Sequence, residues 1–177
     1  MKTASERGNP AATAATAEVE MQIRGLMIDP LTNMPVVVLK DMASDAVLPI
    51  WVGIFEANAI ALELEKTAMP RPMTHDLLRN MARGLNAVVR KVVVSELRDD
   101  TFLAVIWMEQ EGETVAIDAR PSDALALALR WDCPVYASRA VLENAKQVAE
   151  GPQNASGEEM RRWLENLGDD DMGRYKM

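Results

Sequence analysis

The sequence predicts an α+β fold built from a duplicated strand–hairpin–helix unit, with mixed or antiparallel sheets and peripheral helices. Short β-branched or alternating segments, typical of strands, are interleaved with segments whose apolar residues recur at helical spacing. In addition, a shift of 67 residues aligns residues 20–62 with residues 87–129 without a gap, so that turns fall on turns. A chain of 177 residues that is 49% hydrophobic is also long and apolar enough for one domain with a substantial core.

The first unit is expected to contain three strands and one helix. A turn at residues 30–33 and a hairpin loop at residues 41–46 separate segments that are rich in β-branched residues. The helix is expected to bury one apolar face, to which Ile54 and Leu64 belong. These patterns predict strands at residues 19–28, 35–39 and 47–52 and a helix at residues 54–67.

Another helix is expected between the two units. Residues 69–72 contain two prolines and form a connection, because proline cannot continue a helix. Thr74 is a suitable N-cap, Asp76 lies in the first turn, and Gly84 marks the C-terminal end. The sequence therefore predicts a short helix that starts after Thr74.

The second unit repeats the pattern and is followed by one more strand and one more helix. Pro121 occupies the first position of the repeated helix, where its missing N–H leaves no hydrogen bond unmade. Ser138 is expected to cap the helix that follows the last strand. Strands are predicted at residues 87–97, 102–109, 114–119 and 135–137, and the repeated helix at residues 121–131.

A single α+β domain is expected to span residues 19–147, between two terminal segments. Residues 1–18 lack the apolar stretch of a secretory signal and are expected to form a flexible tail. Residues 148–177 are expected to contain a linker, an amphipathic C-terminal helix and an acidic tail. A capping box at Ser156 and Glu159 predicts that helix, and its apolar stripe consists of Met160, Trp163, Leu164 and Leu167.

The composition favours a cytoplasmic protein without a membrane segment. No apolar run approaches the roughly 20 residues that a transmembrane helix needs, and the single cysteine, Cys133, fits a reducing compartment. The net charge of −8 argues against a tight, extended nucleic-acid interface, because such interfaces are usually basic. A local basic surface is still possible, since six basic residues and one acidic residue lie between Lys66 and Lys91.

Polar groups gather in two segments where strands lead into helices. The first segment is RPMTHD at residues 71–76, and the second is DARPSD at residues 118–123. A helix N-terminus offers free N–H donors and positive potential, and arginine offers a bidentate fork for phosphate or carboxylate. The two segments therefore predict an anion site. The sequence carries none of the motifs of common serine hydrolases, P-loop NTPases or dinucleotide-binding enzymes.

Each candidate residue also has a purely structural interpretation. Glu56 and Asp123 are expected in the first turns of their helices, where an acid complements the helix dipole by up to about 1 kcal/mol. Arg120 is expected to pair with Asp118 or with a partner chain. His75 is the single histidine, and it is either structural or, as a neutral imidazole, a general base or a metal ligand.

Three stretches of the sequence resemble the bifunctional nuclease family, whose BFN domains occur in bacteria and plants. They are LPIWVGIFEANAI at residues 48–60, RPMTHDLL at residues 71–78 and IDARPSDALALALR at residues 117–130. The last stretch is the most specific, because an Arg-Pro-Ser-Asp run that opens an alanine-rich helix is unusual. The resemblance covers about residues 20–145, and the final helix with its acidic tail is similar to an extension of many members.

The resemblance implies an α+β fold, self-association as a homodimer or higher oligomer, and a capacity to cleave both DNA and RNA. A metal-dependent nuclease needs carboxylates that converge on a hard cation such as Mg²⁺, and cationic groups that hold phosphate. The candidate catalytic residues are Glu56, His75, Asp76, Asp118 and Asp123, and the candidate substrate-binding residues are Arg71, Arg79, Arg120 and Ser122.

Two functions are consistent with these observations. One is weak, metal-assisted phosphodiester hydrolysis of DNA and RNA. The other is a non-enzymatic, dimeric module that regulates a partner or binds an anion or another ligand. Candidate side chains that converge in an open cleft would favour the nuclease, whereas side chains tied up in mutual ion pairs beneath the helices would favour the module.

Overall fold

The computed structural model describes residues 17–30 and 32–150 and confirms the predicted α+β fold. The first unit consists of β1 (Glu18–Ile28), β2 (Pro35–Asp41), β3 (Val47–Trp51) and α1 (Ile54–Leu64). After α2 (Thr74–Gly84), the second unit consists of β4 (Ala87–Arg98), β5 (Thr101–Gln110), β6 (Glu113–Ala119) and α3 (Pro121–Trp131). The described part ends with β7 (Val135–Ser138) and α4 (Arg139–Glu150), and none of its helices is long and apolar enough to cross a membrane.

The strands form one seven-stranded sheet in the order β3-β2-β1-β7-β4-β5-β6. The short strand β7 lies in the middle, antiparallel to β1 and parallel to β4. Consequently β1 and β4 run in opposite directions, and each is followed towards its own edge by two further antiparallel strands. This order fits a pseudo-twofold relation between the units, and α1 and α3 begin and end 67 positions apart.

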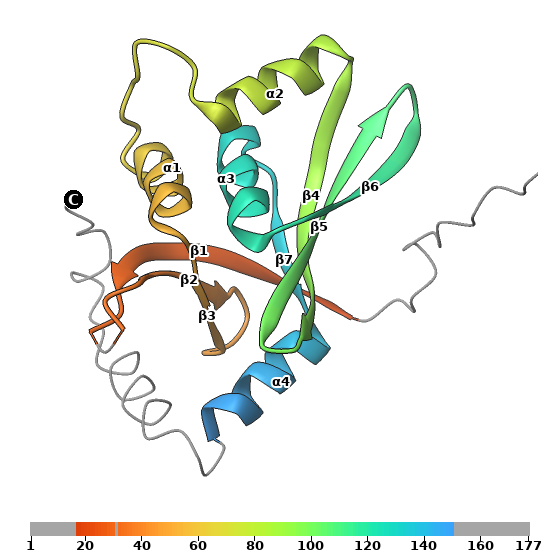
Figure 1. Ribbon diagram of the computed structural model, residues 1–177. Helices are drawn as coiled ribbons and strands as arrows, with labels where there is room; N and C mark the ends of the chain where they lie inside the picture. The colour runs from red at the N-terminus through yellow and green to blue at the C-terminus, as the bar shows by residue number, and fades with distance from the viewer. Residues whose placement is uncertain (1–16, 31, 151–177) are drawn as a thin grey trace, which may run out of the picture.

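The helices hold the two units together around a common core. α1 and α3 pack side by side, α2 packs against α3, and α4 contacts β4 and β7 at the opposite end of the molecule (Figure 1). The core includes the fully buried side chains of Leu39, Leu48, Ile60, Val92 and Leu125, and burying each such side chain contributes about 1.5–3 kcal/mol. The packing of α1 on α3 places corresponding parts of the two repeated helices next to each other.

The structure corrects three details of the sequence interpretation. α1 ends at Leu64 instead of residue 67, because Lys66 adopts a left-handed backbone conformation with φ 51°. Met73 and not Thr74 is the N-cap of α2, and its N–H donates to Asp76 Oδ2 at 2.9 Å. The face of α1 expected to be buried is also partly wrong, since Ile54 is 63% exposed.

The predicted terminal segments lie almost entirely outside the described residues. The expected flexible tail at residues 1–18 overlaps the structure only at its last two residues, where β1 begins at Glu18. The segment expected at residues 148–177, with its linker, amphipathic helix and acidic tail, overlaps the structure only at residues 148–150, which belong to α4. The predictions for the two terminal segments therefore stay predictions.

Candidate functional site

The N-terminal turns of α1 and α3 meet, and their acidic residues share one arginine. Arg120 Nη2 lies 2.9 Å from Glu56 Oε1, and Arg120 Nε donates to Asp123 Oδ2 at 2.8 Å. Glu56 and Asp123 occupy equivalent positions of the two repeated helices. Arg120 therefore pairs with these two acids, and not with Asp118 as expected from the sequence.

His75 joins this group from the first turn of α2. Its Nε2 lies 3.0 Å from Asp123 Oδ1, and the residue is buried with 7% exposure. Because an ionised carboxylate can only accept hydrogen bonds, Nε2 carries the shared hydrogen and Nδ1 of a neutral ring keeps the free lone pair. We call the four residues Glu56, His75, Arg120 and Asp123 the Arg120 cluster.

The electrostatics of the cluster keep Asp123 charged. Burial acts to raise the pKa of Asp123, but the hydrogen bonds from Arg120 and His75 outweigh burial and hold this pKa below its ordinary value. The same hydrogen bond, together with that to Glu56, raises the pKa of Arg120. A carboxylate that is charged at neutral pH therefore orients the imidazole, as in other acid–histidine pairs.

A glycine gives the Glu56 carboxylate the space that it needs. Gly53 is the N-cap of α1 and corresponds in the repeat to Arg120, the N-cap of α3. A Cβ atom at Gly53 would overlap Glu56 Oε2 and approach Glu56 Cδ to 3.2 Å. The backbone at Gly53 is extended, with φ −70°, so that space and not conformation requires a glycine here.

A second polar network lies beneath the helices and involves Asp76. Arg130 is almost fully buried, and its Nε donates to Asp76 Oδ1 at 2.7 Å. Its other nitrogens donate to the carbonyl oxygens of Ala126 at 2.9 Å and Ala59 at 3.2 Å. Arg130 therefore joins α1, α2 and α3, and Asp76 faces this arginine while its neighbour His75 faces Asp123.

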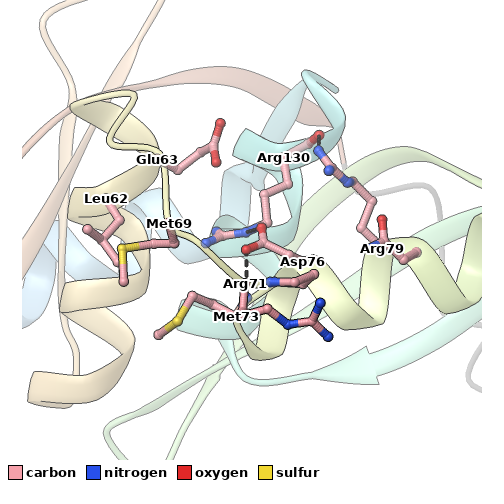
Figure 2. A pocket seen from close by; sticks show the side chains of 10 residues that line it. Leu62, Glu63, Met69, Arg71, Met73, Asp76, Arg79 and Arg130 are labelled. Carbon is pink, nitrogen blue, oxygen red and sulfur yellow. Dashed lines mark hydrogen bonds and ion pairs between the residues drawn. The ribbon is translucent and has the colours of Figure 1, made fainter.

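The remaining candidates lie outside the Arg120 cluster. Asp118 is exposed on the edge strand β6, and Ser122 is buried in the first turn of α3 with 8% exposure. Arg71 and Arg79 line an open pocket of about 220 Å³ that lies between α1 and α2 (Figure 2). Neither this pocket nor a larger one beside the hairpin loop is lined by any residue of the Arg120 cluster.

The described residues do not offer a preformed metal site. No three His, Cys, Asp or Glu side chains in residues 17–30 and 32–150 lie close enough together to hold a metal ion. The Arg120 guanidinium lies between Glu56 and Asp123, where two converging carboxylates would otherwise attract a cation. The carboxylates that the sequence proposed as metal ligands thus form no preformed site in this part of the chain, and the expected divalent cation stays a prediction.

Two residues that matter for the site were not among the candidates. Gly53 carries no chemical group, and its role appears only when the position of Glu56 is known. Arg130 carried a signal, because an arginine in an otherwise Ala- and Leu-rich helix requires a buried partner or an exposed face. The sequence alone could not decide between these alternatives.

The chain belongs to the bifunctional nuclease domain family, because the family model matches residues 37–150. This assignment confirms the resemblance drawn from the three sequence stretches. The matched region contains both repeated helices, α2 and all residues of the Arg120 cluster.

Individual relatives connect the chain to bacterial and plant proteins. It is 38% identical over 126 residues to an uncharacterized protein of Mycobacterium tuberculosis strain H37Rv, covering 71% of this chain and 75% of that protein. It is 26% identical over 119 residues to bifunctional nuclease 1 of Oryza sativa subsp. japonica, covering 66% of this chain and 36% of the plant protein. Bifunctional nuclease 1 of Arabidopsis thaliana is 26% identical over 109 residues, which cover 59% of this chain and 34% of that protein.

Proposed function

We propose that this chain is a weak nuclease that hydrolyses phosphodiester bonds in DNA and RNA. The observation that carries the proposal is the Arg120 cluster, in which an oriented histidine lies beside an exposed arginine. Membership of the bifunctional nuclease domain family supports it, as do the plant relatives that are named bifunctional nucleases. The net charge of −8 agrees with weak rather than tight binding of a polyanion.

Arg120 is the residue that we expect to contact the phosphodiester. Its side chain is 67% exposed, and two of its five N–H donors are accounted for by Glu56 and Asp123. The remaining donors can bind phosphate oxygens while the two acids hold the guanidinium in place. The role of Glu56 in this proposal is thus to position Arg120.

His75 is the residue that we expect to transfer a proton. Asp123 accepts a hydrogen bond from Nε2, which leaves Nδ1 of the neutral ring as the proton acceptor for the attacking group. Proton transfer by a positioned side chain typically contributes 10²–10⁴-fold to a rate. Asp118, Ser122 and Asp76 are not needed for these two roles, and their sequence-based assignments stay predictions.

The test is cleavage of single-stranded DNA and RNA by purified variants. Asp123→Ala and His75→Gln are expected to lower the rate at least about 100-fold, because each removes the oriented proton acceptor. Asp45→Ala is the matched control, since Asp45 lies in the exposed hairpin loop. If Asp123→Ala retains the full rate while its thermal unfolding is normal, the cleavage comes from a contaminant or another site.

The Mg²⁺ dependence expected from the sequence is also part of the proposal. The carboxylates of the described residues form no preformed site for it, so the roles given to Arg120 and His75 do not depend on a metal. We expect that EDTA lowers cleavage and that added Mg²⁺ restores it. Cleavage that is unaffected by EDTA would show that protein groups alone carry the reaction.

One observation favours the alternative function, a non-enzymatic dimeric module. The acids and the arginine of the cluster neutralise one another in ion pairs, as expected for a structural corner or an anion site.

We propose in addition that the chain is a cytoplasmic homodimer or higher oligomer. Cys133 is consistent with a cytoplasmic location, because burial raises the pKa of its thiol to about 11 and such a thiol has no redox function.

A further inference from the structure

The pocket between α1 and α2 contains more positive charge than its acids neutralise. It is enclosed by the end of α1, the proline-rich connection and the first turns of α2 (Figure 2). The charged side chains that line it are those of Glu63, Arg71, Asp76, Arg79 and Arg130. Such an excess matters in this chain, because the net charge of the whole protein is −8.

Both acids of the pocket already have cationic partners. Asp76 Oδ1 lies 2.7 Å from Arg130 Nε, and Glu63 Oε1 lies 3.1 Å from Lys66 Nζ. Once these two pairs are set aside, Arg71 and Arg79 are left. Neither forms an ion pair with a carboxylate of the part of the chain that the structure describes. The charge of Arg79 helps to lower the pKa of Asp76, but Asp76 is already paired with Arg130, so the pocket keeps an excess of positive charge.

The structure holds Arg79 in position without neutralising it, and it restricts the backbone at Arg71. Arg79 Nη1 donates to the carbonyl oxygen of Arg130 at 3.2 Å, which holds the side chain but removes no charge. Arg79 Nε is buried and has no hydrogen-bond partner, which is costly unless a bound group or a local shift supplies one. Arg71 lies between Pro70 and Pro72, whose rings restrict the backbone of the connection.

We propose that this pocket binds one phosphate group. Two guanidinium groups, one of them held by a hydrogen bond to the Arg130 carbonyl oxygen, match the charge and the oxygen geometry of phosphate, and the adjacent N-terminus of α2 adds positive potential. A volume of about 220 Å³ is below the roughly 300–1,000 Å³ of pockets for drug-sized ligands, so it suits a phosphate group better than a whole nucleotide.

The inference rests on the proposed function in one respect. His75 and Asp76 are neighbours in the first turn of α2, where His75 faces the Arg120 cluster and Asp76 lines the pocket. A nucleic-acid strand held at the cluster would therefore have a neighbouring phosphate close to Arg71 and Arg79. The pocket would then position the strand and leave the proton transfer to His75.

Calorimetric titration at low ionic strength tests phosphate binding with two probes. The first probe is inorganic phosphate, and the second is a short oligothymidylate that has no terminal phosphate. We expect Arg71→Gln and Arg79→Gln to weaken binding of at least one probe about tenfold or more. The control Arg83→Gln, in the last turn of α2 outside the pocket, is expected to bind like the wild type.

The pattern of affinities identifies the source of the phosphate. If the pocket variants lose binding of both probes, the pocket is a general phosphate site. If they lose binding of the oligonucleotide alone, the pocket is a site for backbone phosphates. The inference is overturned if the wild type binds neither probe, if both pocket variants bind unchanged, or if Arg83→Gln weakens binding equally. Arg71→Gln keeps the test decisive if Arg79→Gln does not fold, because Arg71 is exposed.

Cleavage kinetics separate this inference from the nuclease proposal. We expect Arg71→Gln to raise KM for the oligonucleotide with little change in kcat, because the pocket binds the strand away from the reaction. His75→Gln is expected to lose kcat and still bind phosphate. If His75→Gln cleaves normally while Arg71→Gln loses phosphate binding, the nuclease proposal fails and the phosphate pocket stands.

Discussion

Gly53 acts on the site through the space that it leaves for a neighbouring carboxylate. Gly53→Ala would place a Cβ atom where Glu56 Oε2 now lies, so the Glu56 side chain must rotate away from Arg120. The far end of a flexible side chain moves easily, and the extended backbone suits alanine. We therefore expect a stability change within about 1 kcal/mol but at least a tenfold lower cleavage rate, measured by thermal unfolding and nuclease assay.

The matched control for this substitution is Gly84→Ala. A Cβ atom at Gly84 meets no atom within 4 Å, so cleavage should stay at the wild-type rate. Glu56→Gln should resemble Gly53→Ala, because both weaken the hold on Arg120. If Gly53→Ala cleaves normally while Glu56→Gln does not, the displaced Glu56 carboxylate still contacts Arg120 in another rotamer, and Gly53 has no positioning role.

Asp123 links the site to the pH dependence of stability. Its pKa is depressed below the ordinary value of 3.8, since hydrogen bonds from Arg120 and His75 outweigh the opposing effect of burial. A depressed carboxylate contributes stability above pH 3.8, and this contribution is lost as the pH falls through the folded-state pKa. We expect Asp123→Asn to cost about 1 kcal/mol at pH 7 and progressively less as the pH falls from 3.8 through the folded-state pKa.

Urea unfolding of the wild type and of Asp123→Asn at several pH values measures this difference. Asp45→Asn provides the control, because the Asp45 side chain is fully exposed and only its solvated ion pair with Lys40 is lost, which should cost less than about 1 kcal/mol. A cost of Asp123→Asn that does not decrease at any pH below 3.8 would contradict the assigned hydrogen bonds.

At the residue scale, the sequence could name the members of the site but not their contacts. Glu56, His75, Arg120 and Asp123 were all candidates, yet Arg120 was expected to pair with Asp118 or with a partner chain. Glu56 is 64 positions away from Arg120, and its approach depends on the packing of α1 against α3. Local sequence carries no information about such a contact, and so the choice among several acids required the fold.

At the scale of elements, the sequence repeat between the two units supported the prediction of the helix bounds. The bounds of α3 were predicted correctly, and the equivalent helix α1 starts at the predicted residue. The errors lie at helix ends, where a single residue decides the outcome. Lys66 turns left-handed and ends α1 early, and Asp76 accepts a hydrogen bond from the Met73 N–H that fixes the start of α2.

The buried pair of Arg130 and Asp76 is expected to stabilise the packing of α1, α2 and α3 against one another. Asp76→Ala leaves the Arg130 guanidinium, whose side chain is 2% exposed, with carbonyl partners only. Breaking such a pair by removing one partner typically costs about 3–5 kcal/mol. Because the Asp76 side chain is 23% exposed and water can partly replace it, we expect about 2–3 kcal/mol from urea unfolding.

A double variant distinguishes the lost charge pair from lost packing. Asp76→Ala combined with Arg130→Met removes both charges and keeps much of the volume, so it should be more stable than Asp76→Ala alone. The control Glu96→Ala removes the acid of an exposed ion pair with Arg98 and should cost less than about 1 kcal/mol. If the double variant is the least stable of all, Arg130 acts through packing contacts and not through its charge.

At the scale of the whole molecule, α2 presents an apolar surface that no other described element covers. Leu77, Leu78, Met81 and Leu85 recur at helical spacing along its outer side, and each is between 44% and 63% exposed. Contiguous apolar surface of this kind marks interaction sites in soluble proteins. Because the same stripe on a second copy would be self-complementary about a twofold axis, we expect it to form the homodimer interface.

Light scattering at micromolar concentration tests this expectation. The wild type should have the mass of two chains, and Leu78→Glu combined with Met81→Glu should return it to the mass of one, because two charges would be buried on each side of the axis. Met42→Glu serves as the matched control, since Met42 is 62% exposed in the hairpin loop and should leave the dimer intact. A dimer that survives both charges on α2 would place the interface elsewhere, and a monomeric wild type would remove the proposed homodimer altogether.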